Sequence, residues 1–313
     1  MKKILQKIEG QRLLFILITI IVVLSVKGRG NFLSILSLYR ILDEITVMGI
    51  LAIGMTVVML NGSIDLSIGS VMSLAGIITI LLQPYGLVIA IAGGMIVATL
   101  VGVLNGLLVV KGGINSFIAT LGTMVITKGI AFVLTGSQPI KGTIKSFENI
   151  GHGYILGVPN SALFLCILYV LCIYLLKYTR FGRNDYAIGG NELSAYLAGI
   201  HVGLYRFLFF VFCSLLAGIA GIIFSSTVNG GSAIFGDQVV LIVVAAVMLG
   251  GTSLFGGRGT LIGTFQGVVI LGLIERAMMI FNTTAYWQYI IRGGIILVVV
   301  IISSLTEMEE SVK

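Results

Sequence analysis

Long apolar runs alternate with short polar segments along almost the whole chain. A helix that crosses a membrane needs about 20 consecutive, mostly apolar residues. The runs predict an all-α polytopic membrane protein with about ten transmembrane helices, built as a single domain over residues 1–313. They lie at about Leu13–Val26, Ile45–Leu60, Ile68–Leu82, Gly86–Val110, Ser116–Thr135, Ser161–Leu176, Tyr205–Ser225, Val239–Leu249, Thr260–Phe281 and Tyr289–Leu305.

Two segments fit this pattern less well. Val239–Leu249 is too short to cross about 30 Å of hydrocarbon as a straight helix. A broken helix formed with Gly250–Gly259, its backbone buried in protein, is one interpretation. Phe32–Leu42 spaces its apolar side chains around one face and carries Arg40, which indicates either an interfacial helix or the flank of the next span.

The longest polar interruption, Lys177–Arg206, divides the chain near its middle. It carries four basic side chains, Lys177, Arg180, Arg183 and Arg206. Membrane proteins keep such loops in the cytoplasm, and ten crossings then place both termini there and Gly136–Asn160 outside. Within the loop, Asn191–Gly199 predicts a short helix with small residues, which serves either as a docking surface for a soluble partner or as an ordinary connector.

The composition supports the membrane assignment. Hydrophobic side chains make up 58% of the 313 residues, charged ones 10%, and the mean hydropathy is +1.13, values outside the range of soluble domains. The net charge of +7 comes from basic residues at the N-terminus and at segment ends, so it reflects topology rather than nucleic-acid binding. The glycine pairs Gly102/Gly106 and Gly263/Gly267 predict close helix crossings.

The sequence contains few residues suited to catalysis or metal binding. The three cysteines lie in apolar runs without metal-ligand spacing and the two histidines lie in different loops, so neither a metal site nor a cofactor is expected. Gly257-Arg258-Gly259 lacks the Lys-Ser/Thr of a phosphate-binding loop. The chain is not expected to hydrolyse ATP itself.

Polar residues inside or beside the apolar runs are the candidates for a transport pathway. Asp65 has two interpretations, because an ionisable residue at membrane depth is costly and often functional, whereas a side chain before the helix near Ser67 also serves as a cap. The uncharged residues either hydrogen-bond neighbouring helices or contact a hydroxylated solute. The full candidate set is Asn61, Ser63, Asp65, Asn105, Asn115 and Gln266.

Three charged residues suggest a different kind of transporter. Lys128, Glu275 and Arg276 are compatible with a proton relay, as in a self-powered secondary transporter. Alternatively, Glu275 pairs with Arg276 and Lys128 extends to the outer interface. A weak internal repeat is also present, since Val58–Ser63 resembles Val247–Thr252; it indicates either a duplication, as in many transporters, or chance.

Four stretches carry a resemblance to one known family. They are TRFGRNDYAIGGNELSAYLAGI (Thr179–Ile200), NGSIDLSIGS (Asn61–Ser70), NGLLVVKGGINSFIATLG (Asn105–Gly122) and GGTSLFGGRGTLIG (Gly250–Gly263). In order and spacing they resemble the permease subunits of ribose-type ABC importers. The Glu-Ala-Ala consensus of many ABC permeases is replaced here by Leu193-Ser194-Ala195.

The resemblance implies a transport function and its partners. It implies import of a monosaccharide, ribose or a related sugar, across the bacterial cytoplasmic (inner) membrane, by this chain and a second permease chain, identical or different, within the lipid. A separate ABC ATP-binding subunit would grip a coupling helix, through Gly189, Gly190, Asn191, Ser194, Ala195, Ala198 and Gly199. An extracytoplasmic sugar-binding protein would dock around Gly136–Asn160 and Thr227–Gln238. Branched-chain amino acid permeases and ion-driven secondary transporters are the alternatives.

Overall fold

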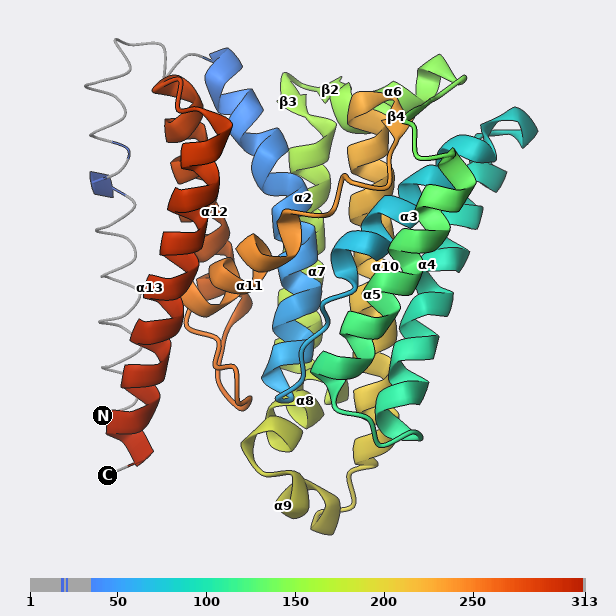
Figure 1. Ribbon diagram of the computed structural model, residues 1–313. Coiled ribbons are helices and arrows are strands. Elements are labelled where there is room, and N and C mark those ends of the chain that lie inside the picture. The colour runs from blue at the N-terminus through green and yellow to red at the C-terminus, as the bar shows by residue number, and fades with distance from the viewer. Residues whose placement is uncertain (1–17, 20, 22–34, 312–313) are drawn as a thin grey trace.

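The chain forms a bundle of long helices in the computed structural model (Figure 1), which describes residues 18, 19, 21 and 35–311. Within those residues, six helices are long and apolar enough to cross a membrane. They are α2 (Ile35–Leu60), α4 (Leu87–Val110), α5 (Ser116–Thr135), α7 (Asn160–Tyr178), α10 (Val202–Val228) and α12 (Leu261–Ile280). Three more are shorter or have a shorter apolar part: α3 (Ile68–Leu81), α11 (Val239–Leu249) and α13 (Ala285–Ser311). All nine runs predicted between residues 45 and 305 lie largely within these helices, whereas the first predicted run falls almost entirely outside the described residues.

The remaining elements gather at the two ends of the bundle. Figure 1 shows α8 (Arg180–Gly190) and α9 (Glu192–Leu197) beyond the helices at one end, called here the α9 end, which the C-terminal part of α13 also reaches. The opposite end, called the β4 end, carries short strands and turns. These are β1 (Ile140–Lys141) paired with β4 (Gly230–Gly231), β2 (Tyr154–Ile155) paired with β3 (Val158–Pro159), α6 (Glu148–His152), and the 3-10 turns Gln83–Tyr85 and Lys145–Phe147.

Helix α2 is the centre of the bundle. Its span is 83% buried, and α10, α11, α12 and α7 pack around it, whereas only 22% of α4 and 28% of α5 are buried. A helix that is apolar on all sides suits either protein or hydrocarbon surroundings, and this sequence uses both. Because α2 runs unbroken from Ile35 to Leu60, the separate interfacial helix proposed for Phe32–Leu42 is wrong over its described part, and that part is the flank of the span.

The glycine pairs make the closest helix contacts. A Cβ on Gly102 would lie 2.9 Å from the Cα of Val211, and one on Gly106 would lie 3.2 Å from the carbonyl oxygen of Phe207, both on α10. On α12, a Cβ on Gly267 would lie 2.1 Å from the carbonyl oxygen of Ala246. Both pairs therefore serve close packing, as predicted.

Two helices begin at the middle of the bundle. With 14 and 11 residues, α3 and α11 are about 21 and 17 Å long at 1.5 Å per residue, short of a bilayer core. Figure 1 shows residues 61–67 rising without helix from the lower end of α2 to the start of α3, and residues 232–238 descending from the upper end of α10 to the start of α11. The predicted outer loop Thr227–Gln238 thus lies at the β4 end only in its first part and then enters the bundle. Such irregular backbone occurs at membrane depth where protein covers it.

Residues 250–260 do not continue α11 as a second half-helix. They form turns that return toward the α9 end, where the N–H of Gly257 bonds to the carbonyl oxygen of Leu60 at 2.8 Å. The chain is interrupted after α11, as the length of the run indicated, but the expected broken helix over 239–259 is wrong in its second part.

The repeated hexapeptides Val58–Ser63 and Val247–Thr252 end their helices in the same way. In each copy the sixth N–H bonds to the first carbonyl, at 3.1 and 3.2 Å, and the fifth N–H bonds to the second carbonyl, at 2.9 and 2.8 Å. The fifth residue is Gly62 or Gly251, with φ of 77° and 86°. This is the Schellman ending, which needs a residue in the left-handed region. The sequence repeat therefore corresponds to a repeated local structure.

Candidate functional site

Asp65 lies at the centre of a fully buried polar network. Its Oδ1 accepts hydrogen bonds from the N–H of Ser67 at 2.9 Å and from the Ser67 hydroxyl at 2.6 Å. Asn105 on α4 donates to the Ser67 Oγ at 2.9 Å and reaches Asp65 Oδ1 at 3.5 Å. Asp65 therefore orders the turn into α3 through Ser67, the N-cap of that helix, and does not itself cap a free N–H group of α3.

Hydroxyl groups on α5 accept hydrogen bonds from the backbone N–H groups on either side of Asp65. The N–H of Ile64 donates to the Ser116 hydroxyl at 3.2 Å, and the N–H of Leu66 donates to Thr120 Oγ1 at 3.1 Å. The Thr123 hydroxyl donates to Asn105 Oδ1 at 2.7 Å. Since buried backbone donors require partners, these bonds explain how a non-helical segment persists at membrane depth. The network joins α3, α4 and α5; its centre at Asp65, Ser67 and Asn105 is 0% exposed, whereas Ser116 at its edge is partly exposed.

The six predicted pathway residues do not form one cluster. The structure brings Asp65 and Asn105 together, both 0% exposed. Asn61 and Ser63 are buried at the end of α2, where Asn61 donates to the Val57 carbonyl at 3.1 Å, so it caps α2 from within rather than α3. The other two lie elsewhere: Asn115 is the exposed N-cap of α5 and Gln266 is partly exposed on α12.

The predicted short helix is present at the α9 end. Asn191 is its N-cap, and its side chain accepts from the N–H of Ser194 at 2.8 Å. Gly199, with φ of 82°, terminates it, and the N–H of Ile200 bonds to the carbonyl of Ala195 at 3.1 Å. Of the seven coupling candidates, Gly190, Asn191, Ser194, Ala198 and Gly199 are exposed, Gly189 is partly covered and Ala195 is buried.

The outer surface of α9 is more apolar than the small residues suggested. Leu193 and Tyr196 are each 67% exposed and Leu197 is 76% exposed, although all three lie beyond the membrane spans. Sequence reasoning missed them because it looked for small residues. Their position three and four residues apart on a capped helix was the available signal.

Helix α8 packs tightly against the end of α2 and against residues 250–260. A Cβ on Gly189 would lie 1.8 Å from the carbonyl oxygen of Leu60 and 2.5 Å from the nitrogen of Gly257. The Tyr186 hydroxyl donates to the carbonyl of Gly259 at 2.8 Å. Gly189 is therefore a packing residue that lets three segments meet.

Two carboxylates of this end have opposite electrostatic surroundings. Asp185 on α8 is 0% exposed, and burial raises its pKa well above the ordinary value of 3.8, although the neighbouring Asn61 amide lowers it somewhat. Neither of its oxygens has a hydrogen bond of ordinary geometry within the part of the chain that the structure describes, so the Asn61 amide beside it offsets only part of the effect of burial. Glu192 on α9 accepts both guanidinium bonds of Arg206, at 3.2 and 2.9 Å, and this lowers its pKa.

The charged residues considered for a proton relay have other partners. Lys128 pairs with Asp237 at 2.8 Å, Glu275 with Arg292 at 3.1 Å and Arg276 with Glu44 at 4.0 Å. The expectations that Glu275 pairs with Arg276 and that Lys128 extends to the outer interface are therefore wrong. The actual partners of Lys128 and Arg276 are far away in the sequence.

The sequence was compared with known proteins. The family model described as "Branched-chain amino acid transport system / permease component" matches residues 37–300. The ribose import permease protein RbsC of Bacillus subtilis (strain 168) is 37% identical over 306 residues, 96% of this chain and 93% of that protein. The ribose import permease protein RbsC of Escherichia coli (strain K12) is 34% identical over 94% of this chain and 93% of that protein.

A third relative carries a different sugar in its name. The L-arabinose ABC transporter permease protein AraH of Azospirillum brasilense is 34% identical over 87% of this chain and 80% of that protein. No solved structure matches this chain.

Proposed function

Since this chain belongs to the ribose-type family of ABC importer permeases, we propose that it is the membrane-spanning permease subunit of an ATP-driven importer for a monosaccharide, ribose or a related sugar. Its relatives are named for ribose, L-arabinose and D-allose, uncharged sugars that differ in size and in the orientation of hydroxyl groups. The shared chemistry is a neutral, polyhydroxylated solute. ATP hydrolysis belongs to a separate subunit in this proposal.

The distribution of basic residues supports a cytoplasmic location for the α9 end, in a bacterial inner membrane. The loops and helix ends on this side carry Lys111, Lys177, Arg180, Arg183, Arg206 and Arg258, whereas those on the β4 side carry Arg40, Lys141, Lys145 and Arg276. The positive-inside bias counts such residues. The C-terminal part of α13 lies at the same end, in agreement with a cytoplasmic C-terminus.

The observation that carries the proposed coupling role is the exposed apolar surface of α9. Leu193, Tyr196 and Leu197 project from a short helix with ordered caps at both ends. Buried Ala195 and the Glu192–Arg206 ion pair attach this helix to the bundle. A protruding helix with an apolar face fits a groove on a soluble protein, here the ABC ATP-binding subunit. The exposed coupling candidates lie beside this apolar face.

Movement of α9 has a structural route to the middle of the bundle. It is joined through Asn191 to α8, and Gly189 of α8 rests on the last turn of α2. Residues 61–67 continue from that turn to the start of α3. In the proposed cycle, ATP-driven closure of the ATP-binding subunits shifts α9 and α8 together, and the end of α2 and residues 61–67 follow.

The other partners lie around the bundle. We place an extracytoplasmic sugar-binding protein on the β4 end, over residues 136–160 and the first part of the 227–238 segment. A second permease chain, the same or a different one, completes the pathway, and lipid surrounds the rest. The secondary-transport alternative is less consistent with the structure, because Lys128, Glu275 and Arg276 are each engaged by an oppositely charged partner.

Uptake into proteoliposomes tests the proposal. The chain is reconstituted with its ATP-binding subunit and a sugar-loaded binding protein, and labelled D-ribose uptake is measured with ATP inside or with an ion gradient alone. ATP-dependent uptake that requires both partners, and that competing sugars but not leucine reduce, is expected. Gradient-driven uptake by the chain alone would refute it, and competition by leucine would favour the amino acid alternative.

A further inference from the structure

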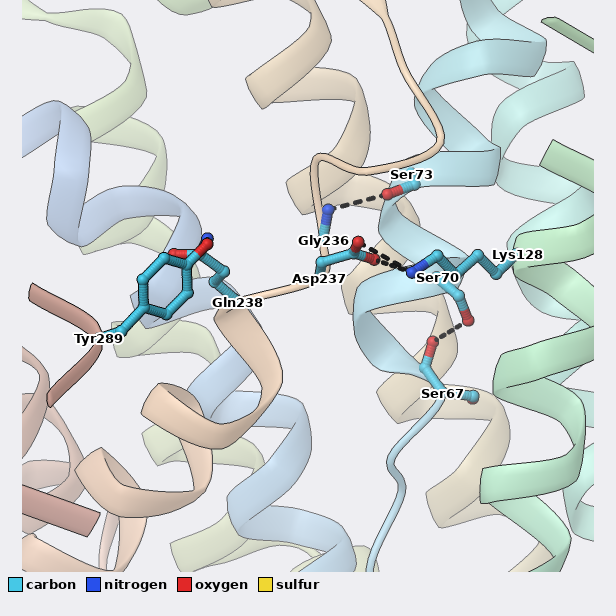
Figure 2. A network of polar contacts seen from close by, with 8 residues as sticks. All are labelled: Ser67, Ser70, Ser73, Lys128, Gly236, Asp237, Gln238 and Tyr289. Atoms are coloured by element: carbon cyan, nitrogen blue, oxygen red, sulfur yellow. Dashed lines mark hydrogen bonds and ion pairs between the residues drawn. The ribbon is translucent and has the colours of Figure 1, made fainter. Parts of the chain in front are cut away.

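A row of polar side chains crosses one face of the bundle from α5 to α13. Lys128 on α5 pairs with Asp237, and the next residue, Gln238, bonds to the Tyr289 hydroxyl and to Arg292 on α13. Arg292 in turn pairs with Glu275 on α12 at 3.1 Å. Figure 2 shows the part of this row from Lys128 to Tyr289. The set is called here the polar belt: Lys128, Asp237, Gln238, Tyr289, Arg292 and Glu275.

The belt lies at membrane depth. Lys128 is followed by seven further residues of α5, so it is about 10 Å from the end of that helix at 1.5 Å per residue. Asp237 lies at the end of the segment that descends to the middle of the bundle, one residue before Gln238, the N-cap of α11. Neither residue is near enough to an end to be explained as an interfacial anchor.

The belt is only partly covered by its own chain. The side chains of Lys128 and Asp237 are 36% and 38% exposed. Charged groups that face hydrocarbon at this depth cost several kcal/mol, so this face is not a lipid face. It faces water or the second permease chain. The exposed surface of α7, on the other side of α2 in Figure 1, is apolar and serves as the reference.

The backbone beneath Asp237 is held firmly while its carboxylate is accessible. The N–H of Gly236 donates to the Ser73 hydroxyl on α3 at 2.9 Å, and a Cβ on Gly236 would lie 1.9 Å from the carbonyl oxygen of Gly69. Asp237 also lies at the positive N-terminal end of α11, where the helix dipole favours its charge. A fixed backbone with an exposed, charged side chain is the arrangement expected of a preorganised binding group.

We propose that the Lys128–Asp237 pair and the neighbouring polar belt form a sugar-contacting site in the middle of the translocation pathway. The carboxylate of Asp237 accepts hydrogen bonds from sugar hydroxyls, and the ammonium of Lys128 donates to them. Two cations and two anions in the belt leave no net charge, so it offers directional bonds to a neutral sugar without the field that would trap an ion. This site rests on the proposed function.

Thiol accessibility tests whether Asp237 faces water, independently of transport. Asp237→Cys is placed in a background with Cys166, Cys172 and Cys213 changed to Ala, and a charged, water-soluble thiosulfonate is applied to the reconstituted complex. Val170→Cys, on the exposed surface of α7 (67% exposed), is the matched control. Faster modification at residue 237 than at residue 170 supports a water-facing site. Modification at residue 237 that is no faster than at residue 170 overturns it.

Transport by charge variants tests the contact itself. Asp237→Asn is expected to reduce the D-ribose uptake rate about tenfold or more, the size of one lost hydrogen bond to a charged group. Co-purification with the partner subunits shows whether the variant complex still assembles. The exchange Lys128→Asp with Asp237→Lys retains an ion pair. It therefore distinguishes a direct contact between Asp237 and the sugar from a purely structural role of the ion pair. Persistent loss of uptake in the exchanged protein supports the contact, and full recovery overturns it.

The two proposals fail separately. A parental complex that shows no ATP-dependent sugar uptake would refute the proposed function. A parental complex that imports D-ribose, beside an Asp237→Asn complex that imports it equally fast, would refute the polar-belt site alone.

Discussion

Gly69 at the start of α3 and Gly236 before α11 touch through their backbones at the middle of the bundle. A Cβ on Gly69 would lie 2.3 Å from the carbonyl oxygen of Gly236, closer than any side chain fits. The two residues belong to the two segments of the chain that stop at half depth, so their contact fixes where both short helices begin.

Gly69→Ala is therefore expected to destabilise the protein by at least about 1–3 kcal/mol, as overpacking does. The clashing atom is backbone and has no flexible side chain to yield. Gly129→Ala on α5 is the matched control, because no atom lies within 4 Å of the added Cβ and alanine is favoured in helices. Thermal unfolding in detergent measures both. Equal stability of the two variants would mean that the α3 and α11 ends do not pack as described.

Asn105→Ala is expected to lower stability by about 1–3 kcal/mol, the cost of leaving buried polar groups without partners. The change removes the donor to Ser67 and the acceptor for the Thr123 hydroxyl. Asn115→Ala, which removes an exposed N-cap bond, should cost no more than about 1 kcal/mol. A larger loss at residue 115 than at residue 105 would contradict the interpretation of Asn105 as the link between α3, α4 and α5.

Asp185 and Glu192 are expected to contribute opposite pH dependences to the stability of the protein, and Asp185→Asn and Glu192→Gln each remove one of them. Burial raises the pKa of Asp185 above 3.8, so the wild-type protein loses stability as the pH rises from 3.8 through that raised pKa, and the Asn variant escapes this loss. The Arg206 pair lowers the pKa of Glu192 below 4.5. Its stabilising contribution is therefore present above 4.5 and disappears as the pH falls through the lowered pKa.

Unfolding of the wild type and both variants between about pH 3 and 8 measures these slopes, since the Glu192 contribution changes below 4.5 and the Asp185 contribution changes above 3.8. At neutral pH the Asp185→Asn protein should be more stable than wild type. The Glu192→Gln protein should be slightly less stable, by under about 1 kcal/mol because the ion pair is solvent-exposed. A stability loss in Asp185→Asn at neutral pH would show that the carboxylate has a stabilising partner.

Leu197→Glu is expected to weaken association with the ATP-binding subunit about tenfold or more, because it places a charge in the apolar surface of the proposed coupling helix. Leu197 is 76% exposed, so the fold should tolerate the change. Leu156→Glu is the control, since Leu156 is fully exposed at the β4 end. Pull-down with the purified ATP-binding subunit measures both, and unaltered binding of the Leu197 variant would refute the docking role.

Sequence reasoning was reliable where the determinants are local. The apolar runs predicted the helices because composition alone decides which segments enter hydrocarbon. The residues flanking α9 gave its bounds because capping by Asn191 and the left-handed Gly199 act within a few residues. The same local chemistry indicated a structural role for Asp65 before α3, although the side chain bonds Ser67 rather than the N–H groups of the helix itself.

Non-local features could not be predicted in this way. Hydropathy does not show how far across the membrane a helix extends, so α3 and α11 looked like full spans or fragments of spans. The partner of Lys128 is Asp237, more than a hundred residues later, and no pattern in the sequence joins them. The orientation of the side chains on α9 could not be predicted either. Ala195 faces the core while Leu197 faces outward, because of how α9 packs on the bundle.

The half-depth helices also constrain how the protein is made. When residues 61–81 leave the ribosome, α3 is too short to hold a place in the bilayer as an independent span. The groups that satisfy its start come later: the hydroxyls of Ser116 and Thr120 on α5 bond residues 64 and 66, and Gly236 arrives only after α10. The centre of the molecule is therefore assembled late, after most of the surrounding helices have already been inserted, and the insertion machinery must shelter an unfinished segment until then.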